Sequence, residues 1–230
     1  SNKTIIVPPA CEHTTNIFEP SWKRVIQFYA QEYMPKTPFL WTDARRKDTA
    51  KSVLFNGGKP TTTDLSTKYK LINLKPSEVA EIKAFCKSHG IALTSYLEII
   101  GTLILGKTFL KHYKPPSDAQ RKTSTLIAIS GRRFLNNKKF QYGTLVTGDT
   151  YIMEPLDPEL PRVEIVDRMQ KFHQQLHAAV ESRSAFQNIG LMQYLNYWAM
   201  NKKYMGNAER LTLLISNLGM LPKTEGGEKW

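Results

Sequence analysis

The chain has 230 residues, of which 41% are hydrophobic, enough for one sizeable core or two small ones. Its 23% charged residues, 13 Gly, 13 Pro and lack of a short repeat are typical of a globular domain and exclude collagen-like, coiled-coil and solenoid proteins. With 32 Lys and Arg against 20 Asp and Glu, the net charge is +12, which favours an anionic partner such as nucleic acid, acidic lipid or a phosphorylated cofactor.

The first part of the chain predicts a helix followed by a connection. Apolar residues recur at helical spacing over about 21–34, and Ser21 is available as the N-cap. Residues 42–66 show no sustained period and contain a Gly-Gly pair, a proline and a run of threonines, which is typical of an exposed linker. We therefore expect three parts, which are an N-terminal segment with a helix (1–41), a linker (42–66) and a C-terminal domain (67–230).

The C-terminal domain opens with a strand-like segment, 69–74, and two helices. Pro76 suits a first helical position and Gly90 a helix end. A second helix, with Thr94 as a possible cap, is apolar nearly all round, so we expect it to be central and buried. Four of its residues are expected to pack on the sheet, namely Leu97, Ile100, Leu103 and Ile104.

Strands then alternate with helices to the end of the chain. A short apolar run bounded by Gly131 predicts a strand that is covered on both faces. This alternation predicts an α/β domain with a mainly parallel or mixed sheet flanked by helices. The expected elements are strands at 124–130, within 140–153 and, again buried, at 211–216, and helices at about 166–184 and 191–205.

Few residues match a known catalytic or metal-binding pattern. His173 and His177 are four residues apart, but no HExxH motif or third ligand accompanies them, so partly exposed positions on an amphipathic helix are the favoured interpretation. Cys11 and Cys86 lack ligand spacing and are expected to be free thiols, with no metal site. The sequence also lacks GxGxxG, P-loop and GxSxG motifs.

Polar residues directly follow two of the predicted strands. Arg132 and Arg133 follow one strand, and Ser216 and Asn217 end another. The carboxyl ends of buried α/β strands are where ligand crevices form, although an ordinary strand-to-loop turn explains such residues as well.

The segment 107–139 is strongly basic. It holds nine Lys or Arg residues and a single acid, Asp118. A solvated basic face and a site for an anionic cofactor both remain open as explanations. Nucleic acid is not expected, because the segment's aromatic residues show neither stacking-platform spacing nor an RNP-type motif.

Several segments, in order, resemble the fungal alcohol acetyltransferases, a family of chloramphenicol acetyltransferase-like, CoA-dependent acyltransferases. The resemblance covers about 10–221. The segments that carry it are PSW at 20–22, KLINLKPSEVAEIKAFCKSHGIALTSYLEIIGTLILG, ISGRRFL, FQYGTLVTGDT and SNLG at 216–219.

This family's HxxxD motif, whose His deprotonates the acceptor, does not occur in these 230 residues. The residues four positions after the five histidines are Ile17, Leu93, Pro116, His177 and Glu181. The resemblance therefore implies a carboxy-terminal domain, or most of one: half of a condensation-domain-like two-domain fold whose N-terminal half carries the motif. The chain alone is expected to be inactive.

The resemblance also implies roles for the residues at the strand ends. Ser216 and Asn217 would lie at the centre of the channel and support the oxyanion. An alternative for one of the two arginines is a structural ion pair. The residues expected to bind CoA are Arg132, Arg133, Lys138, Lys139 and Gly219.

The expected function is transfer of an acetyl or short acyl group from acetyl-CoA to a small hydrophobic alcohol, without a metal. Two alternatives remain open, which are an N-acyltransferase for a hydrophobic amine and a non-catalytic protein that binds a partner with half of the fold. The expected partners are acyl-CoA, the alcohol and the N-terminal half of the enzyme. The expected location is cytoplasmic, with peripheral association of the full-length enzyme with endoplasmic reticulum or lipid droplets as a further expectation.

Overall fold

A computed structural model describes most of the predicted elements. The described residues are 16–33, 52–55, 68–109, 120–134, 145–154, 156–157, 159–194, 198 and 212–219.

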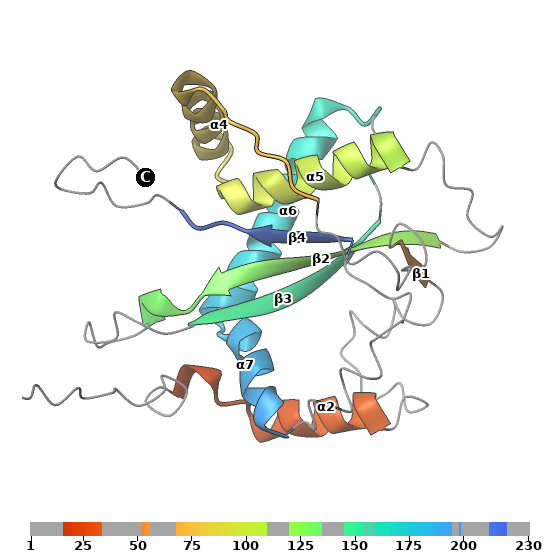
Figure 1. The fold of residues 1–230 in the computed structure, drawn as a ribbon, viewed down its shortest axis with the longest axis vertical. Coiled ribbons are helices and arrows are strands. Elements are labelled where there is room, and N and C mark those ends of the chain that lie inside the picture. Colours follow the sequence, from red (N-terminus) through yellow and green to blue (C-terminus); the bar gives the residue numbers. More distant parts are fainter. Residues whose placement is uncertain are drawn as a thin grey trace, which may run out of the picture.

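A four-stranded mixed sheet forms the centre of the fold (Figure 1). Its longest strand, β2 (Gln120–Ser130), pairs antiparallel with β3 (Val146–Met153) along one edge. Along the other edge β2 pairs in parallel first with β1 (Ser52–Phe55) and then with β4 (Leu213–Ser216). The α/β fold with a mixed sheet, predicted from the alternation of elements, is confirmed.

Helix α6 (Arg162–Glu181) crosses behind the sheet and forms the main core with it (Figure 1). Its apolar residues recur at helical spacing on one face, and each fully buried side chain of this size stabilises the fold by about 1.5–3 kcal/mol. That face packs against Ile127 and Ile129 of β2 and Leu145. The four buried residues of α6 are Met169, Phe172, Leu176 and Val180.

The opposite face of the sheet is only partly covered. Leu214 of β4 is 57% exposed and Val146 of β3 is 43% exposed, because no described helix lies over them. The prediction that the strand is buried on both faces is therefore wrong for β4, whereas in β2 the consecutive residues Thr123, Ser124 and Thr125 are all buried.

Residues 69–74, predicted as a strand, have no regular secondary structure. Four of their side chains are exposed, by 95% at Tyr69, 81% at Leu71, 72% at Ile72 and 52% at Leu74. A strand needs a partner for its backbone N–H and C=O groups, and no described strand pairs with this segment.

The two helices after this segment lie where they were predicted. Helix α4 (Pro76–Ser88) begins at the proline, and the Glu78 carboxylate accepts a hydrogen bond of 2.6 Å from the backbone N–H of Lys75. Helix α5 (Leu93–Phe109) begins one residue before the predicted cap, Thr94.

The buried face of α5 differs from the predicted one. Ile100 and Leu103 pack partly against the core, but Leu97 is 41% and Ile104 is 55% exposed. The fully buried side chains are mostly polar. These buried residues of α5 are Ser95, Glu98, Ile99 and Thr102.

No single helix among the described residues is long and apolar enough to cross a membrane. Helices α4 and α5 together meet the length and composition for a span, but they are bent by 104° at the break between them.

A short helix that the sequence did not predict follows α6. The chain breaks at Arg183, whose φ of 59° is left-handed, and α7 (Ser184–Gly190) then runs down to the N-terminal elements. Of the helix predicted at 191–205, Leu191–Tyr194 is a 3-10 turn, and nearly all of the rest lies outside the described residues.

The N-terminal elements pack against α7. The 3-10 turn η1 (Asn16–Phe18) brings Phe18 to Phe186, with ring centroids 6.2 Å apart, and helix α2 (Trp22–Tyr33) follows. Arg24 donates a hydrogen bond of 2.8 Å to the side-chain oxygen of Asn188. The expected helix at 21–34 is thus present, and it belongs to the same packed body as α7.

The stretch 42–66, predicted to be a linker, contains the strand β1. The rest of that stretch lies outside the described residues, so the expected domain boundaries remain a prediction.

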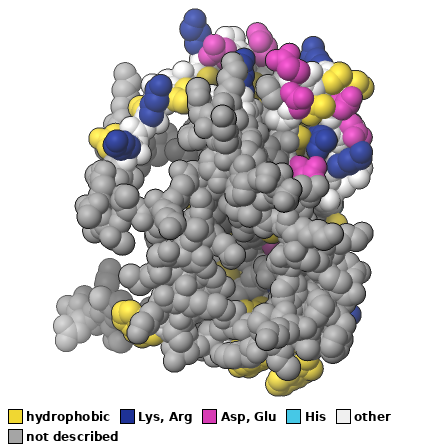
Figure 2. Space-filling view, turned by 90° about the vertical axis from the view of Figure 1, so that its right-hand side faces the viewer, with side chains coloured by type: hydrophobic (Ala, Val, Ile, Leu, Met, Phe, Trp, Pro, Cys, Tyr) yellow, Lys and Arg dark blue, Asp and Glu magenta, His cyan; other side chains and the backbone are white. Residues whose placement is uncertain are grey.

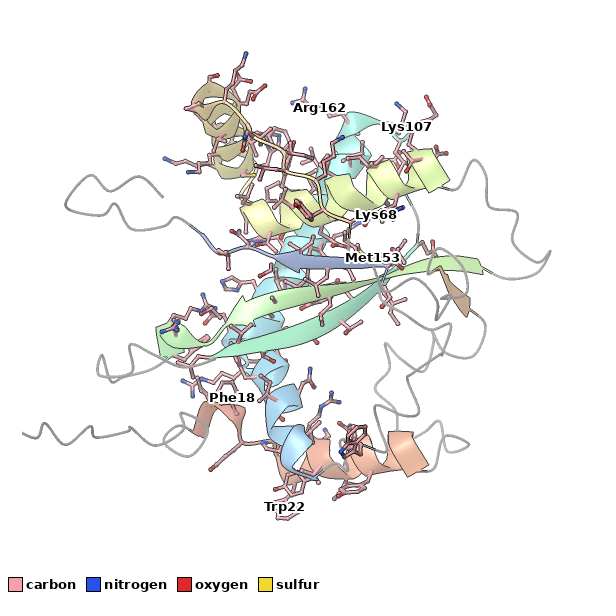
Figure 3. All side chains as sticks on the ribbon, viewed as in Figure 1. Phe18, Trp22, Lys68, Lys107, Met153 and Arg162 are labelled. Carbon is pink, nitrogen blue, oxygen red and sulfur yellow. The ribbon has the colours of Figure 1, made fainter. Side chains whose placement is uncertain are left out.

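The two ends of the molecule differ in surface character. In Figure 2 acidic and basic side chains mingle at the end that holds α4, and apolar side chains gather at the opposite end, where α2 lies. Figure 3 shows Trp22 at that apolar end. The exposed fractions there include 75% at Trp22 and 60% at Ile26, both in α2.

Candidate functional site

A pocket of about 280 Å³ opens where the carboxyl ends of β2 and β4 meet α5 and α6. Because β2 and β4 are parallel, their ends reach the same side of the sheet, and the residues that follow them lie close together. The floor is apolar and the rim is polar. The described lining residues are Ala92, Thr94, Ile127, Ala128, Ile129, Ser130, Arg133, His173, Leu176, His177, Val180 and Asn217.

Asn217 links β4 to α5 at this pocket. Its side-chain amide donates a hydrogen bond of 3.2 Å to the hydroxyl of Thr94, in the first turn of α5. Its side-chain oxygen accepts one of 2.9 Å from the backbone N–H of Gly219, whose φ of 75° favours glycine. Ser216 is exposed and lies opposite Ala128 in the sheet, outside the pocket lining, so Asn217 is the predicted channel residue that the pocket contains.

Arg133 reaches the pocket from the 3-10 turn η3 (Arg132–Phe134), directly after β2. Its guanidinium forms an ion pair of 3.0 Å with Glu181 and lies 4.7 Å from the centre of the Phe134 ring. Arg132 is exposed and lies outside the lining, although its backbone N–H donates to the hydroxyl of Ser130. Of the two arginines predicted to bind CoA, the pocket therefore contains Arg133.

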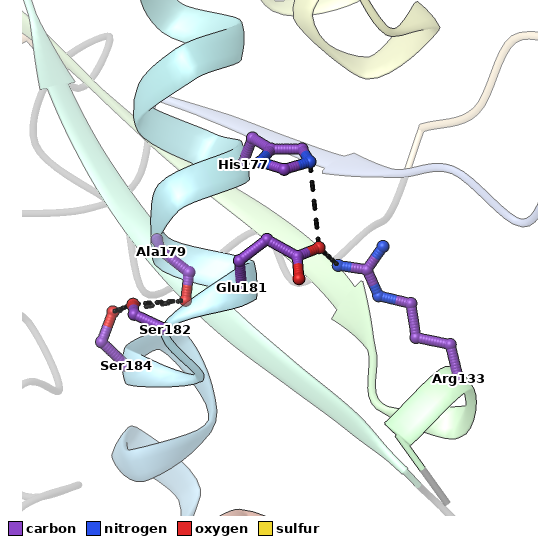
Figure 4. Close-up of polar contacts among 6 residues, drawn as sticks. All are labelled: Arg133, His177, Ala179, Glu181, Ser182 and Ser184. Carbon is purple, nitrogen blue, oxygen red and sulfur yellow. Dashed lines mark hydrogen bonds and ion pairs between the residues drawn. The ribbon is translucent and has the colours of Figure 1, made fainter.

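Two histidines of α6 complete the polar rim. His177 lies 3.8 Å from the same Glu181 oxygen that pairs with Arg133 (Figure 4). The rings of His173 and His177 are 5.9 Å apart, and the buried Nδ1 of His173 has no hydrogen-bond partner among the described residues. The interpretation as partly exposed positions is correct in burial, but it missed that both side chains face a pocket.

The spacing of the two histidines was the available signal. An i, i+4 pair necessarily shares one helix face, but only the packing of α6 determines what that face meets. The four-residue spacing alone could not distinguish solvent from a pocket.

The described basic side chains of the segment 107–139 do not lie at one place. Lys107 lies in the last turn of α5, thirteen residues beyond Thr94, or about 20 Å at 1.5 Å per residue (Figure 3). Lys138 and Lys139 lie outside the described residues. Among the side chains that the structure describes, Arg133 is therefore the contribution of this segment to the pocket.

A buried polar cluster lies farther along α5. Glu98 is 0% exposed, and one carboxylate oxygen accepts a hydrogen bond of 3.3 Å from Thr102. Among the described residues, its other oxygen and the hydroxyl of Ser95 have no partner in the hydrogen-bond geometry. Burial raises the pKa of Glu98, and the hydroxyls of Thr125 and Thr102 oppose that rise.

Within the part of the chain that the structure describes, no three His, Cys, Asp or Glu side chains are grouped so that they could hold a metal ion. Cys86 is a free thiol buried in the core, and Cys11 lies outside the described residues.

The family model for alcohol acetyltransferase matches residues 19–230. The chain belongs to the alcohol acetyltransferase family. The match includes every strand of the sheet and every described residue of the pocket lining. The resemblance seen in the sequence is confirmed at the level of the family.

No curated protein sequence matches the chain. Among solved structures, polyketide synthase associated protein 5 from Mycobacterium tuberculosis is similar, with a TM-score of 0.40 and 15% identity. That similarity covers 56% of this chain and 33% of the other protein, so this alcohol acetyltransferase family member spans about a third of its length.

Proposed function

We propose that the chain forms the C-terminal part of a CoA-dependent acyltransferase that makes an ester from an alcohol. The alcohol oxygen attacks the thioester carbonyl, the C–S bond breaks, and the hydroxyl proton leaves on the base and reaches the CoA thiolate. The family match over 19–230 is the observation that carries this proposal. The donor is acetyl-CoA or another short acyl-CoA, and the acceptor is a small hydrophobic alcohol.

The pocket supplies binding groups rather than the base. Arg133 offers a charged donor for a phosphate oxygen, and Asn217 offers an amide close to the strand ends. The base belongs to an HxxxD motif, which these 230 residues do not contain. We therefore propose that the other half of a two-domain fold provides it, and that this chain alone binds acyl-CoA without turning it over.

The absence of HxxxD also supports one rival, a non-catalytic protein that binds its partner with this half of the fold. The two differ in their need for acyl-CoA, since the rival requires no acyl donor.

Calorimetric titration of acetyl-CoA into the chain tests the binding step. We expect Arg133→Gln to weaken binding about tenfold or more, because a charged hydrogen bond contributes about 1.5–3 kcal/mol. Arg168→Gln is the matched control, since Arg168 is exposed on α6 outside the pocket lining. No binding of acetyl-CoA, or equal losses in both variants, contradicts the proposed use of the pocket.

Thiol release tests the chemistry. Acetyl-CoA and isoamyl alcohol are mixed with the chain, and free CoA is followed with a thiol dye. We expect no sustained release, because general-base catalysis contributes about 10²–10⁴ in rate and its histidine is absent. Sustained release would show that a histidine of this chain acts as the base. A longer reading frame with an HxxxD motif is expected to restore turnover.

A further inference from the structure

The pocket face of α6 carries two titratable groups to which neither the family resemblance nor the strand ends give a role. His173 and His177 stand one turn apart, and their rings are separated by 5.9 Å. Both line the pocket together with Arg133. The Nδ1 atom of His173 is buried and has no partner in the described part of the chain, which costs free energy unless a ligand or a water meets it.

The charges around the pair leave the rim close to neutral. Arg133 and Glu181 form an ion pair, and His177 lies 3.8 Å from the same carboxylate. The lining residues from β2, the end of β4 and the first turn of α5 carry no charge, and that first turn has no acidic residue. Among the described groups, protonation of the two histidines therefore determines whether this rim is neutral or positive.

The donors of the rim point to an oxyanion. A protonated imidazole donates from both ring nitrogens, whereas the neutral ring donates from one. The amino end of a helix adds free N–H groups and a positive dipole, and Ala92 and Thr94 at the start of α5 line this pocket. Beneath the donors lies an apolar floor formed by Ile127, Ile129, Leu176 and Val180.

We infer that His173 and His177 bind the phosphate or carboxylate group of a ligand, and that the apolar part of this ligand lies on the floor of the pocket. The affinity for this oxyanion rises when the two histidines are protonated. If the oxyanion is a phosphate of acyl-CoA, the inference rests on the proposed function. The other source is the carboxylate of a short free acid.

Two cations 5.9 Å apart repel each other, and an oxyanion between them removes that repulsion. Binding and protonation therefore favour each other, as linkage requires. For one linked proton, affinity falls about tenfold for each tenfold loss of the protonated form.

The test uses the whole chain and follows the imidazole C–H signals of its histidines by NMR. The probes are sodium sulfate, whose charge is constant between pH 6 and 8, sodium hexanoate and acetyl-CoA. Variants His173→Gln and His177→Gln assign the signals and remove the charge. His177 is 60% exposed at its side chain, so this variant is expected to keep the fold. His89, outside the pocket lining, is the internal control.

We expect sulfate to shift the signals of His173 and His177 at pH 6, with about tenfold weaker binding at pH 7.5 and little shift of His89. His177→Gln should reduce this pH dependence, whereas Arg133→Gln should weaken binding at both pH values. Displacement of sulfate by acetyl-CoA assigns the site to a CoA phosphate. Displacement by hexanoate alone assigns it to a carboxylate.

Binding of equal strength at pH 6 and 7.5, or equal shifts at His89, would overturn the inference. So would the absence of binding of all three probes. Loss of acyl transfer in the longer enzyme while sulfate still binds in this manner would contradict the proposed function and leave the oxyanion site intact.

Discussion

The side-chain amide of Asn217 donates to the hydroxyl of Thr94 at 3.2 Å, although the two residues are 123 positions apart in the chain. The same side chain accepts the N–H of Gly219 through its oxygen. One residue thus fastens the turn after β4 to the first turn of α5. This link holds two parts of the polar rim together, because Thr94 of α5 and Asn217 after β4 both line the pocket.

Asn217→Ala should lower the free energy of unfolding by about 1 kcal/mol, because it removes both hydrogen bonds at a partly solvated site. Thr94→Val should cost less, since the Gly219 contact remains. Urea denaturation of both variants and of the double variant gives a coupling energy, expected at about 0.5–1 kcal/mol. Fully additive losses would mean that the two side chains do not interact in solution.

The ion pair between Arg133 and Glu181 should contribute little to stability. Its side chains are 53% and 51% exposed, and such pairs contribute about 0–1 kcal/mol. Glu181→Gln should therefore change the free energy of unfolding by less than about 0.5 kcal/mol, and less at high salt. A loss of several kcal/mol would favour the structural role of this arginine over ligand binding.

Glu98 should make stability fall as pH rises. Burial raises its pKa above the ordinary value of 4.5, so the native state holds this proton more tightly than the unfolded chain. The stabilisation is complete below pH 4.5 and is lost as the pH rises through the raised pKa, by up to about 1.4 kcal/mol per pH unit. Glu98→Gln should remove this slope in urea titrations above that pH.

The control for this experiment is Glu164→Gln, which changes an exposed acid in the first turn of α6. It should leave the slope above pH 4.5 unchanged. An equal slope in wild type and Glu98→Gln would show that Glu98 is ionised in the native state.

Gly190→Ala should be severely destabilising. A Cβ there would collide with the backbone carbonyl oxygen of Phe18, and backbone cannot rotate away as a side chain can. We expect a loss of about 3 kcal/mol or more, measured by thermal and urea unfolding. Gly101→Ala is the matched control, because its Cβ would meet only Cδ2 of Leu213, at 3.0 Å, and alanine favours the helix by about 1 kcal/mol.

The elements that the sequence predicted well are those with a strong pattern of their own. β2 was predicted from a continuous apolar, β-branched run and α6 from apolar residues at helical spacing, and both formed near the expected positions. The segment 69–74 has the composition of a strand but no described partner, and pairing is a tertiary property that composition does not contain. Helix α7 depends on a left-handed residue, Arg183, that no turn signal announces.

The roles of the site residues remain predictions, and only their positions can be compared with the structure. The rule that ligand crevices form at strand ends led to Asn217 and Arg133, and both line the pocket. It did not distinguish Ser216 from Asn217, since the alternation of a strand decides which neighbour faces which side. The sequence did not predict the pocket position of the two histidines, because that position depends on which element faces α6. The sequence does not show that this element is α5.

The position of β2 in the sheet has a consequence for the order of events on the ribosome. The strand pairs with β1, which is synthesised before it, and with β4, which is synthesised after it. Next to β4, the backbone N–H of Ser124 donates a hydrogen bond to the hydroxyl of Thr212, which is 88 residues later in the chain. Such long-range pairs are slow to form. Until residue 216 has been translated, the edge of β2 that β4 covers stays open to other chains, so the nascent protein passes through an aggregation-prone stage before β4 is available.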